Sequence, residues 1–297
     1  MIPRIIAAMQ APTLLQRLSQ AKQWRIETLD AGDSALQEAS LCKLPQWDGD
    51  LTGVVAAWAC SPAHVEWFQN YCRGVPIWWL GHNVKPELYP TVARRLPLLC
   101  FTQHSLGVLA PLHLGEHRAH VVPRYDPEPV WRWQAGMSWA MRSRPKHRFA
   151  DEVSRLEWVV AQAQERRPHT HLRFGEGQPG GFVDEAGKRA VSASCSAYVS
   201  SLPPWTGIQQ GEHEAMALGC PMITAPNQDY ATGGLVSPCV AESEVDQVAA
   251  LARCLDHPGV AAEASAAGLA YVARWHGAAR SEESVCSYLE AAARARG

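Results

Sequence analysis

Apolar and polar residues alternate along this chain in two patterns that follow one another. Short runs rich in β-branched and aromatic residues, such as 51–58 and 75–80, predict buried strands. Between the runs, apolar residues recur every three or four positions, as at 12–21, 62–72 and 86–96, and this spacing predicts helices. Strands and helices joined by short connections predict α/β units, with parallel sheets covered by helices on both faces.

The α/β pattern occurs twice, once in each half of the chain. Residues 127–136 separate the halves; they contain two prolines and no clear period, and we interpret them as a linker. We therefore predict two Rossmann-like domains, 1–126 and 137–297, whose parallel sheets face a central cleft. The end of the second domain is alanine-rich and helical from 242, with an interruption at 258–259. The strands are expected at 2–9, 23–29, 51–58, 75–80, 97–102, 119–123, 137–141, 170–174, 196–202 and 221–225.

The stretch 203–221, PPWTGIQQGEHEAMALGCP, is the most informative in the sequence. It begins after a predicted strand and contains a predicted helix at 211–219. Carboxylates in the first turn of this helix suit the positive end of the helix dipole, and Gly219 supplies a C-terminal stop. Ligands of parallel α/β sheets bind at the carboxyl ends of the strands, so the loop at 205–211 is expected to lie at a ligand site.

Residues 214–221, EAMALGCP, resemble part of the donor-binding domain of GT-B glycosyltransferases, in the retaining, family 4-like group that uses nucleotide sugars. Those enzymes carry a Glu, seven residues, a second Glu and a small-residue helix ending in Gly-x-Pro. Glu214 matches the second Glu, whereas Thr206 stands where the first would be. The resemblance implies that Glu214 binds the nucleotide ribose. It also implies that the donor sugar is bound by Thr206, Gly207, Gln209 and Gln210.

Two observations keep a plainer interpretation of this stretch open. Glu212 and Glu214 could simply cap a helix. The Gly-Gly-x-Pro-Glu loop of the family is also missing after residue 225. The order of predicted elements in both halves nevertheless resembles the family, with an acceptor domain first and a donor domain second.

A basic segment at 142–148, RSRPKHR, places four cations between a predicted strand and a predicted helix. A nucleotide diphosphate needs such charge, most of all when it departs as a leaving group. The resembled family uses an Arg and a Lys about six residues apart. Arg142 and Arg148 have this spacing, with Lys146 as an alternative for the second position. A solvated loop, or one that contacts nucleic-acid phosphates, is the other interpretation.

His82 is the candidate catalytic residue on the acceptor side. It lies in a Gly-His-Asn turn at the carboxyl end of a predicted strand, where it could bond a sugar hydroxyl or the departing phosphate. It could equally be an ordinary turn residue. The glycine-rich loop at 175–181 lacks GxGxxG spacing, so it is not expected to form a phosphate cradle. The family resemblance implies that it forms a wall of the base or ribose site.

No metal site and no other cofactor are predicted. The histidines at 113, 117 and 120, and those at 169 and 171, lack the partners of a known zinc pattern. There is no Asp-x-Asp pattern for a nucleotide-bound ion, no Gly-x-Ser-x-Gly elbow and no P-loop, which excludes ordinary serine hydrolases and P-loop kinases. The donor is expected to be UDP-linked and to need no metal.

Composition adds limits rather than a function. The 297 residues carry a formal charge of −2, which gives no overall attraction to nucleic acid. Nine cysteines without a CxxC pair indicate reduced thiols. The sequence shows no signal-peptide pattern and no run long enough to span a membrane, so a cytoplasmic protein is expected.

The family resemblance implies a hexosyl- or pentosyltransferase that moves a sugar from a nucleotide sugar to an acceptor hydroxyl with retention. The acceptor could be a saccharide, a small molecule or a hydroxymethylated base in DNA. The alternative is a non-catalytic GT-B relative that binds a nucleotide sugar or a partner protein. The oligomeric state is not indicated by the sequence.

Overall fold

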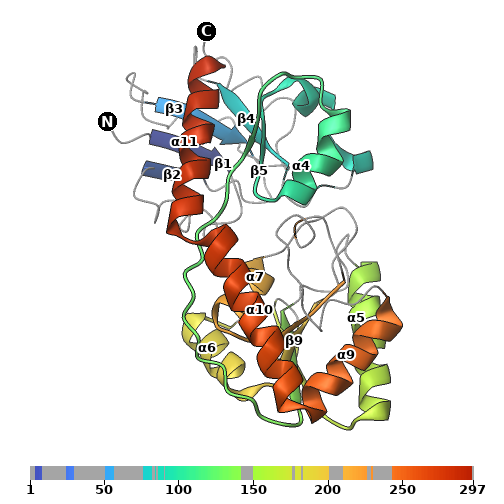
Figure 1. The fold of residues 1–297 in the computed structure, drawn as a ribbon. Helices are drawn as coiled ribbons and strands as arrows, with labels where there is room; N and C mark the ends of the chain where they lie inside the picture. Colours follow the sequence, from blue (N-terminus) through green and yellow to red (C-terminus); the bar gives the residue numbers. More distant parts are fainter. Residues whose placement is uncertain are drawn as a thin grey trace. The chain divides into compact units, whose positions relative to one another are not determined.

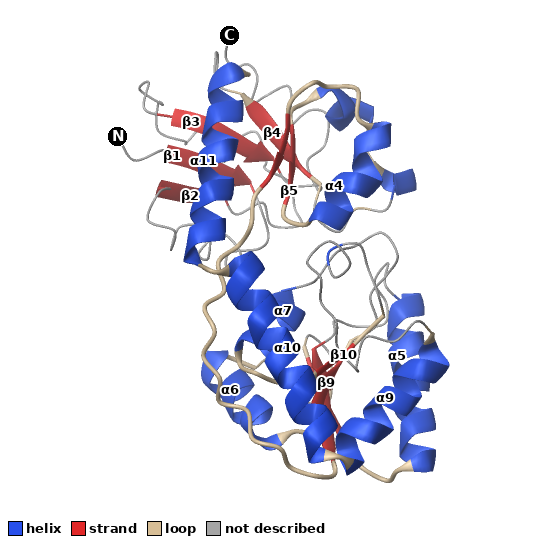
Figure 2. Cartoon of the chain, in the orientation of Figure 1, coloured by secondary structure: helices blue, strands red, loops and turns tan. Residues whose placement is uncertain are grey.

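The structure is a computed structural model whose contacts divide the chain into two compact units. Unit 1 comprises Met1–Arg124 and Ala278–Gly297, and unit 2 comprises Tyr125–Gly277. Each unit has one parallel sheet with helices packed on it (Figures 1 and 2). The predicted helices at 12–21 and 62–72 lie outside the described residues. The structure describes residues 4–8, 25–29, 51–56, 76–81, 84, 86–89, 91–141, 150–175, 178–181, 183–200, 210–225, 229 and 243–295.

The sheet of unit 1 has six parallel strands in the order β2-β1-β3-β4-β5-β6. Every strand predicted in the first half is present, although the ends are shorter than the apolar runs suggested. The strands are β1 (Arg4–Ala8), β2 (Arg25–Leu29), β3 (Leu51–Ala56), β4 (Ile77–Leu80), β5 (Leu98–Cys100) and β6 (Arg118–His120).

Side chains of β4 point alternately to the two faces of this sheet, as the period of a strand requires. Trp78 lies edge-on to Tyr288 of helix α11 (Ala278–Arg294), with ring centroids 5.0 Å apart. Trp79 faces the other way and stacks on Tyr89 at 4.8 Å. Both tryptophans are buried, so unit 1 has an aromatic core on each side of its sheet.

Helix α11 belongs to unit 1, whereas the predicted domain boundaries placed all terminal helices with the second domain. Its apolar side chains Val285, Tyr288 and Ala292 are buried in the cluster that contains Trp78. Two serines add hydrogen bonds to Val122: Ser284 Oγ accepts from its N–H at 2.9 Å, and Ser281 Oγ donates to its carbonyl at 2.8 Å. An apolar helix face alone does not specify its partner, but the family resemblance of the helical tail implies this packing, because one terminal helix in that family usually crosses back onto the first domain.

The connections in unit 1 include more 3₁₀ helix than the periodicity predicted. The expected helix at 86–96 is instead two 3₁₀ turns, η1 (Pro86–Leu88) and η2 (Thr91–Arg95). Pro90, between them in the sequence, has no N–H for a continuous helix. After β5, helix α4 (Gln103–Leu109) starts at an N-cap in which Thr102 Oγ1 accepts from the Ser105 N–H, and it continues into η3 (Ala110–Leu112).

The sheet of unit 2 has four parallel strands in the order β10-β9-β7-β8. Ala140 and Val199 point into a core formed with α5 and α9. Trp139 and Tyr198, their neighbours along the strands, point into a second core with α7 and α10. The elements are β7 (Met137–Met141), α5 (Ala150–Arg166), β8 (Thr170–Phe174), α6 (Glu185–Ser194), β9 (Ala197–Val199), α7 (Gln210–Ala217), β10 (Met222–Ile223), α9 (Glu244–Asp256) and α10 (Pro258–His276).

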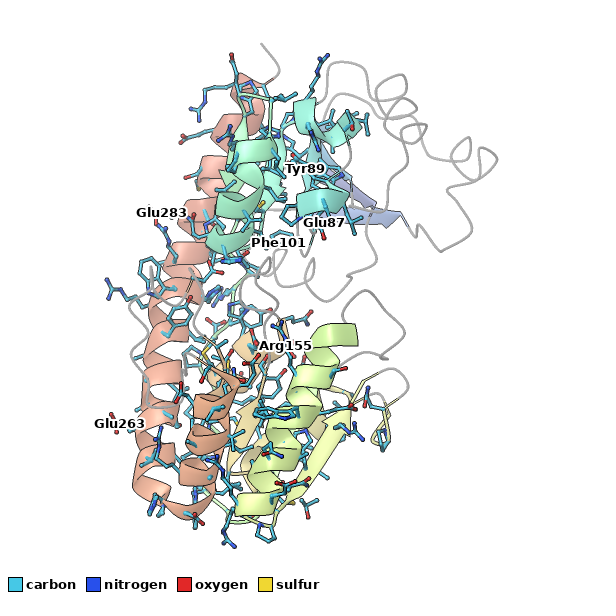
Figure 3. All side chains as sticks on the ribbon, turned by 90° about the vertical axis from the view of Figure 1, so that its right-hand side faces the viewer. Glu87, Tyr89, Phe101, Arg155, Glu263 and Glu283 are labelled. Atoms are coloured by element: carbon cyan, nitrogen blue, oxygen red, sulfur yellow. The ribbon has the colours of Figure 1, made fainter. Side chains whose placement is uncertain are left out.

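The segment predicted as a linker contains no helix or strand and packs along unit 2. Trp131 Nε1 donates to the Cys195 carbonyl at 2.8 Å, and Trp133 Nε1 donates to the Cys254 carbonyl at 2.9 Å. Charged side chains such as Glu263 and Glu283 project outward from the terminal helices, whereas Phe101 lies inside (Figure 3). Among the residues that the structure describes, no helix combines the length and apolar character needed to cross a bilayer.

Removing the Ser284 hydroxyl should destabilise unit 1. In Ser284→Ala the buried Val122 N–H loses its acceptor, which costs about 1–3 kcal/mol of unfolding free energy. Urea unfolding followed by tryptophan fluorescence measures the change. Ser287→Ala is the matched control, because this exposed serine bonds only to the carbonyl of Glu283 in its own helix, and a change within about 0.5 kcal/mol is expected. Equal effects of the two substitutions would contradict the docking of α11 through Ser284.

Candidate functional site

The central strands of unit 2 form a topological switch point. The chain runs from β7 through α5 to β8 on one face of the sheet, and from β8 through α6 to β9 on the other. β7 and β9 are neighbours in the sheet, and the chain leaves them in opposite directions. It passes from β7 to β8 on one side and from β9 to β10 on the other. Ligands of open α/β sheets bind outside the carboxyl ends of such a strand pair. β7 ends at Met141, immediately before the predicted basic segment, and β9 is followed by Ser200.

Helix α7 begins in close contact with the ends of both strands. A Cβ atom on Gly211 would lie 3.0 Å from the hydroxyl oxygen of Tyr198 and 3.6 Å from Cβ of Met141. Only a residue without a side chain fits comfortably at this distance. Gly211 thus lets the first turn of α7 approach the switch point more closely than any other residue type would.

The first turn of α7 is also tied to the sheet through Glu212. This carboxylate is fully buried and accepts a hydrogen bond from Ser200 Oγ, just beyond the end of β9. A negative group at this position suits the positive end of the helix dipole. Glu212 therefore has the structural role that the plainer interpretation of the sequence gave to both glutamates.

Glu214 lies half a turn further on and has different partners. Its side chain is 3% exposed; Oε2 accepts from Lys188 Nζ at 2.7 Å, and Oε1 accepts from Gln210 Nε2 at 2.7 Å. Lys188 comes from α6 and also lies 3.5 Å from Glu185. Each oxygen of a carboxylate can accept more than one hydrogen bond, so these contacts hold the group as an acceptor at a defined position.

The glycine-rich loop after β8 brings α6 to this position. It closes on itself through bonds from Gly175 N to the Gly181 carbonyl at 2.8 Å and from Gly180 N to the Arg173 carbonyl at 2.9 Å. Gly175 and Gly181 have φ angles of 125° and 62°, a region that glycine adopts without strain. Asp184 then caps α6 by accepting from the Gly187 N–H at 2.8 Å. This cap starts the helix so that Lys188 points into unit 2.

The opposite side of α7 is held by a pair of histidines. His213 and His276 are both buried, and their Nε2 atoms lie 3.0 Å apart. One ring must donate and the other accept, so at least one imidazole is neutral. Tyr125 stacks on His213 at 4.8 Å. The pair joins α7 to the end of α10 and restricts movement of the helix that carries Glu214.

Cysteines near the site are packing residues. Burial raises the pKa of Cys195 to about 12 and also raises the pKa of Cys220, whose sulfur accepts from Trp139 Nε1 at 3.4 Å. A thiol with a raised pKa is not a nucleophile at neutral pH. Burial likewise raises the pKa of Tyr271, with Asp229 and Glu212 adding to the effect, so its hydroxyl stays neutral. Within the described ranges, no three metal-binding side chains come close enough to hold an ion.

Two of the site residues predicted from the sequence, Glu214 and Gln210, are described, and the structure brings them into direct contact. Sequence reasoning missed Lys188 and Ser200. The sequence did carry a signal for Lys188, which lies on the same helix face as Val191 and Ser192, because a lysine on a buried face needs a partner. The other predicted site residues lie outside the described part of the chain: His82, Arg142, Lys146, Arg148, Thr206, Gly207 and Gln209.

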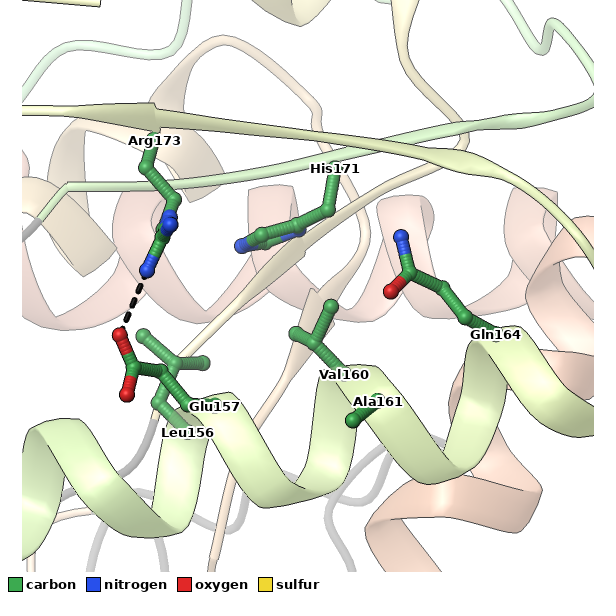
Figure 4. Close-up of a pocket in the computed structure, with 7 residues that line it drawn as sticks. All are labelled: Leu156, Glu157, Val160, Ala161, Gln164, His171 and Arg173. Atoms are coloured by element: carbon green, nitrogen blue, oxygen red, sulfur yellow. Dashed lines mark hydrogen bonds and ion pairs between the residues drawn. The ribbon is translucent and has the colours of Figure 1, made fainter. Parts of the chain in front are cut away.

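A separate pocket of about 330 Å³ lies between α5 and β8 (Figure 4). It contains none of the predicted site residues. Arg173 is paired with Glu157 at 2.5 Å, and His171 Nδ1 is 2.8 Å from Ser138 Oγ. Burial, with help from His169 and Arg173, lowers the pKa of His171 to about 3, so the ring is neutral. The charge of Arg173 is already balanced by Glu157, so the pocket lacks the positive charge that a nucleotide diphosphate needs. We therefore place the candidate site at α7.

Comparisons with known proteins bear on the fold. No protein-family model and no curated protein sequence matches the chain. The structure of HepE from Anabaena, solved with UDP and glucose, is 10% identical with a TM-score of 0.69, covering 97% of this chain and 99% of HepE. An O-GlcNAc transferase mutant from Thermobaculum terrenum is 14% identical with a TM-score of 0.64, covering 99% of this chain and 68% of that protein.

TarM of S. aureus, solved with UDP and other ligands, is 10% identical with a TM-score of 0.61. The match covers 80% of this chain but only 55% of TarM, so the chain spans about half the length of that protein. These solved structures are GT-B glycosyltransferases. The chain therefore has the GT-B fold of two Rossmann-like domains, which confirms the fold predicted from the sequence.

The close approach at Gly211 can be tested against a matched glycine. Gly211 and Gly259 are each the second residue of a helix, but a Cβ on Gly259 would meet nothing within 4 Å. Gly259→Ala should stabilise the protein by about 0.4–1 kcal/mol. Gly211→Ala gains the same preference for helical backbone, but its methyl group crowds the Tyr198 side chain. Its unfolding free energy should therefore be about 1–3 kcal/mol lower than that of Gly259→Ala. Urea unfolding gives both values, and similar stabilities would mean that α7 does not approach the strands closely.

The neutral state of His171 predicts a pH dependence of stability. Its pKa is about 3 in the folded chain against 6.5 for an ordinary histidine, so the unfolded chain takes up the proton first. The unfolding free energy should therefore fall as pH decreases from 6.5 toward 3, by up to about 1.4 kcal/mol per pH unit from this group. His171→Asn should flatten the decrease in urea unfolding measured at several pH values. The exposed His257→Asn serves as the control, and an unchanged profile in His171→Asn would refute the assignment.

Proposed function

We propose that this chain is a glycosyltransferase that moves a sugar from a nucleotide sugar, UDP-linked in our proposal, to an acceptor hydroxyl. The observation that carries the proposal is the buried Glu214, which lies at the switch point of unit 2 with its charge balanced by Lys188. A carboxylate held in this way suits the neighbouring hydroxyls of a ribose. HepE, which has the same fold, was solved with UDP and glucose and also with UDP-glucose.

The remaining site roles extend this proposal. The basic segment follows β7, which ends beside the start of α7, so its cations would stabilise the diphosphate as it departs. We assign this role to Arg142 and to Arg148 or Lys146. The charge would come from side chains rather than a metal ion. The donor sugar would be bound by Thr206, Gly207, Gln209 and Gln210.

The transfer breaks the bond between the anomeric carbon and the diphosphate oxygen and forms one to the acceptor oxygen. We propose retention of configuration, with the proton of the acceptor hydroxyl passing to the departing diphosphate. His82 would contact the acceptor or the departing phosphate, and we assign no protein nucleophile. The acceptor would be a saccharide, a small molecule or a hydroxymethylated DNA base. We also propose a cytoplasmic location, because the nine cysteines of the sequence include no CxxC pair and are typical of reduced thiols.

A second candidate function is binding of a nucleotide sugar without transfer. Thr206 favours it, because the resembled enzymes have a glutamate for the donor sugar at this position. A threonine there would leave nucleotide binding through Glu214 intact and weaken contact with the sugar.

A nucleotide-release assay separates the two functions. The purified chain is mixed with UDP-, GDP- and ADP-sugars, with simple saccharides or hydroxymethylated DNA as acceptors, and products are identified by mass spectrometry. We expect release of one nucleotide only when an acceptor is present. Binding of a nucleotide sugar without release, across all acceptors, would support the binding protein, whereas no binding at all would refute both functions.

Glu214→Gln should weaken binding of the nucleotide. The amide keeps the size of the side chain but replaces charge-assisted hydrogen bonds to the ribose, so we expect a loss of about 10- to 100-fold in affinity by calorimetry. Glu263→Gln, an exposed change on α10, should leave the affinity unaltered. Unchanged affinity in Glu214→Gln, with the fold intact by circular dichroism, would remove Glu214 from the binding site.

A further inference from the structure

Lys188 forms an ion pair with Glu214 that links two helices across 26 residues of sequence. The lysine and glutamate side chains are only 9% and 3% exposed. We infer that Lys188 is a positioning residue, which holds the Glu214 carboxylate so that it selects ribonucleotides over deoxyribonucleotides. This inference rests on the function proposed above.

Stability alone does not account for a pair of this kind. Both charges lose their water on burial, and their mutual attraction often does no more than offset that loss. Apolar residues of similar volume would pack at least as well between α6 and α7. A buried pair at the edge of a candidate ligand site is better explained by an effect on the ligand.

Hydrogen bonds to both oxygens restrict the orientation of the Glu214 carboxylate plane. Lys188 contacts Oε2 from α6, and Gln210 contacts Oε1 from α7, each at 2.7 Å. Because the two donors come from different helices, rotation of the carboxylate would break at least one bond. A carboxylate held at both oxygens can accept from two neighbouring hydroxyls at once, which is the arrangement that distinguishes a ribose from a deoxyribose.

Lys188 also balances the charge of Glu214. With Lys188 beside it, Glu214 presents hydrogen-bond acceptors without a net negative charge. The second contact of Lys188, with Glu185 on its own helix at 3.5 Å, helps to keep the ammonium at this position.

The test compares a ribonucleotide with its dideoxy analogue. Calorimetry first identifies the tightest of UDP, GDP and ADP, and the 2′,3′-dideoxy form of that nucleotide is then measured. Wild type should bind the ribonucleotide at least about tenfold more tightly than the analogue, because hydrogen bonds to a charged group are lost with the hydroxyls. In Lys188→Met the affinity for the ribonucleotide should fall about tenfold or more, while affinity for the analogue changes less than about threefold.

Two further variants distinguish a role of Lys188 in positioning Glu214 from an effect of the substitution on folding of the protein. Lys188→Arg keeps a cation and should restore part of the discrimination. Lys188→Met combined with Glu214→Gln leaves no unpaired buried charge, so it should fold and bind both nucleotides with similar affinity. Circular dichroism and thermal melting report folding for each variant.

The outcomes distinguish this inference from the proposed function. Equal losses for both nucleotides in Lys188→Met would give Lys188 a merely structural role, as would full discrimination in that variant, and the proposed function would stand. Binding by wild type without discrimination would remove the ribose role of Glu214. Failure of wild type to bind any nucleotide would refute the proposed function and this inference together.

Discussion

The close approach of α7 to the carboxyl ends of β7 and β9 is the constraint on which the candidate site depends. Gly211 makes the approach possible, and Ser200 and Glu212 hold it, because the hydroxyl at the end of β9 bonds to the carboxylate in the first turn. Once that turn is in place, the helix geometry carries Glu214 into the interior. A carboxylate at such a position needs a balancing charge, and α6 supplies it through Lys188. The eight residues of α7 therefore both pack against the sheet of unit 2 and carry the carboxylate of its candidate site.

Helix α7 is buried on every side rather than along one stripe. The residues from Glu212 to Ala217 are all buried, and polar side chains occupy half of those positions. Each of the polar groups has a specific partner: Ser200 for Glu212, His276 for His213, and Lys188 for Glu214. Apolar packing tolerates small shifts, but a set of directed bonds does not. The helix is thus suited to holding a ligand group at one defined position.

Much of this fold could be predicted because strands and helices leave short-range patterns. The strand predicted at 137–141 is β7, and the interruption predicted at 258–259 falls at the start of α10. Glu214 could be found because the residues after it form a recognisable motif. Lys188 left only the signal of a lysine on a buried helix face, and its partner is set by how α6 crosses the sheet. The replacement of one predicted helix by two 3₁₀ turns was also missed, although Pro90 lacks the N–H that a continuous helix needs.

The place of α11 has a consequence for synthesis of the protein. The helix is made after all of unit 2, yet its tyrosine and alanines complete the core around Trp78 in the first unit. All of Tyr125–Gly277 must leave the ribosome before that core can close. At about 5–20 residues per second, the delay is roughly 10–30 s, during which one face of the first sheet lacks its covering helix. Unit 2 is continuous in sequence and can finish folding earlier, so unit 1 is completed after unit 2 although its synthesis starts first.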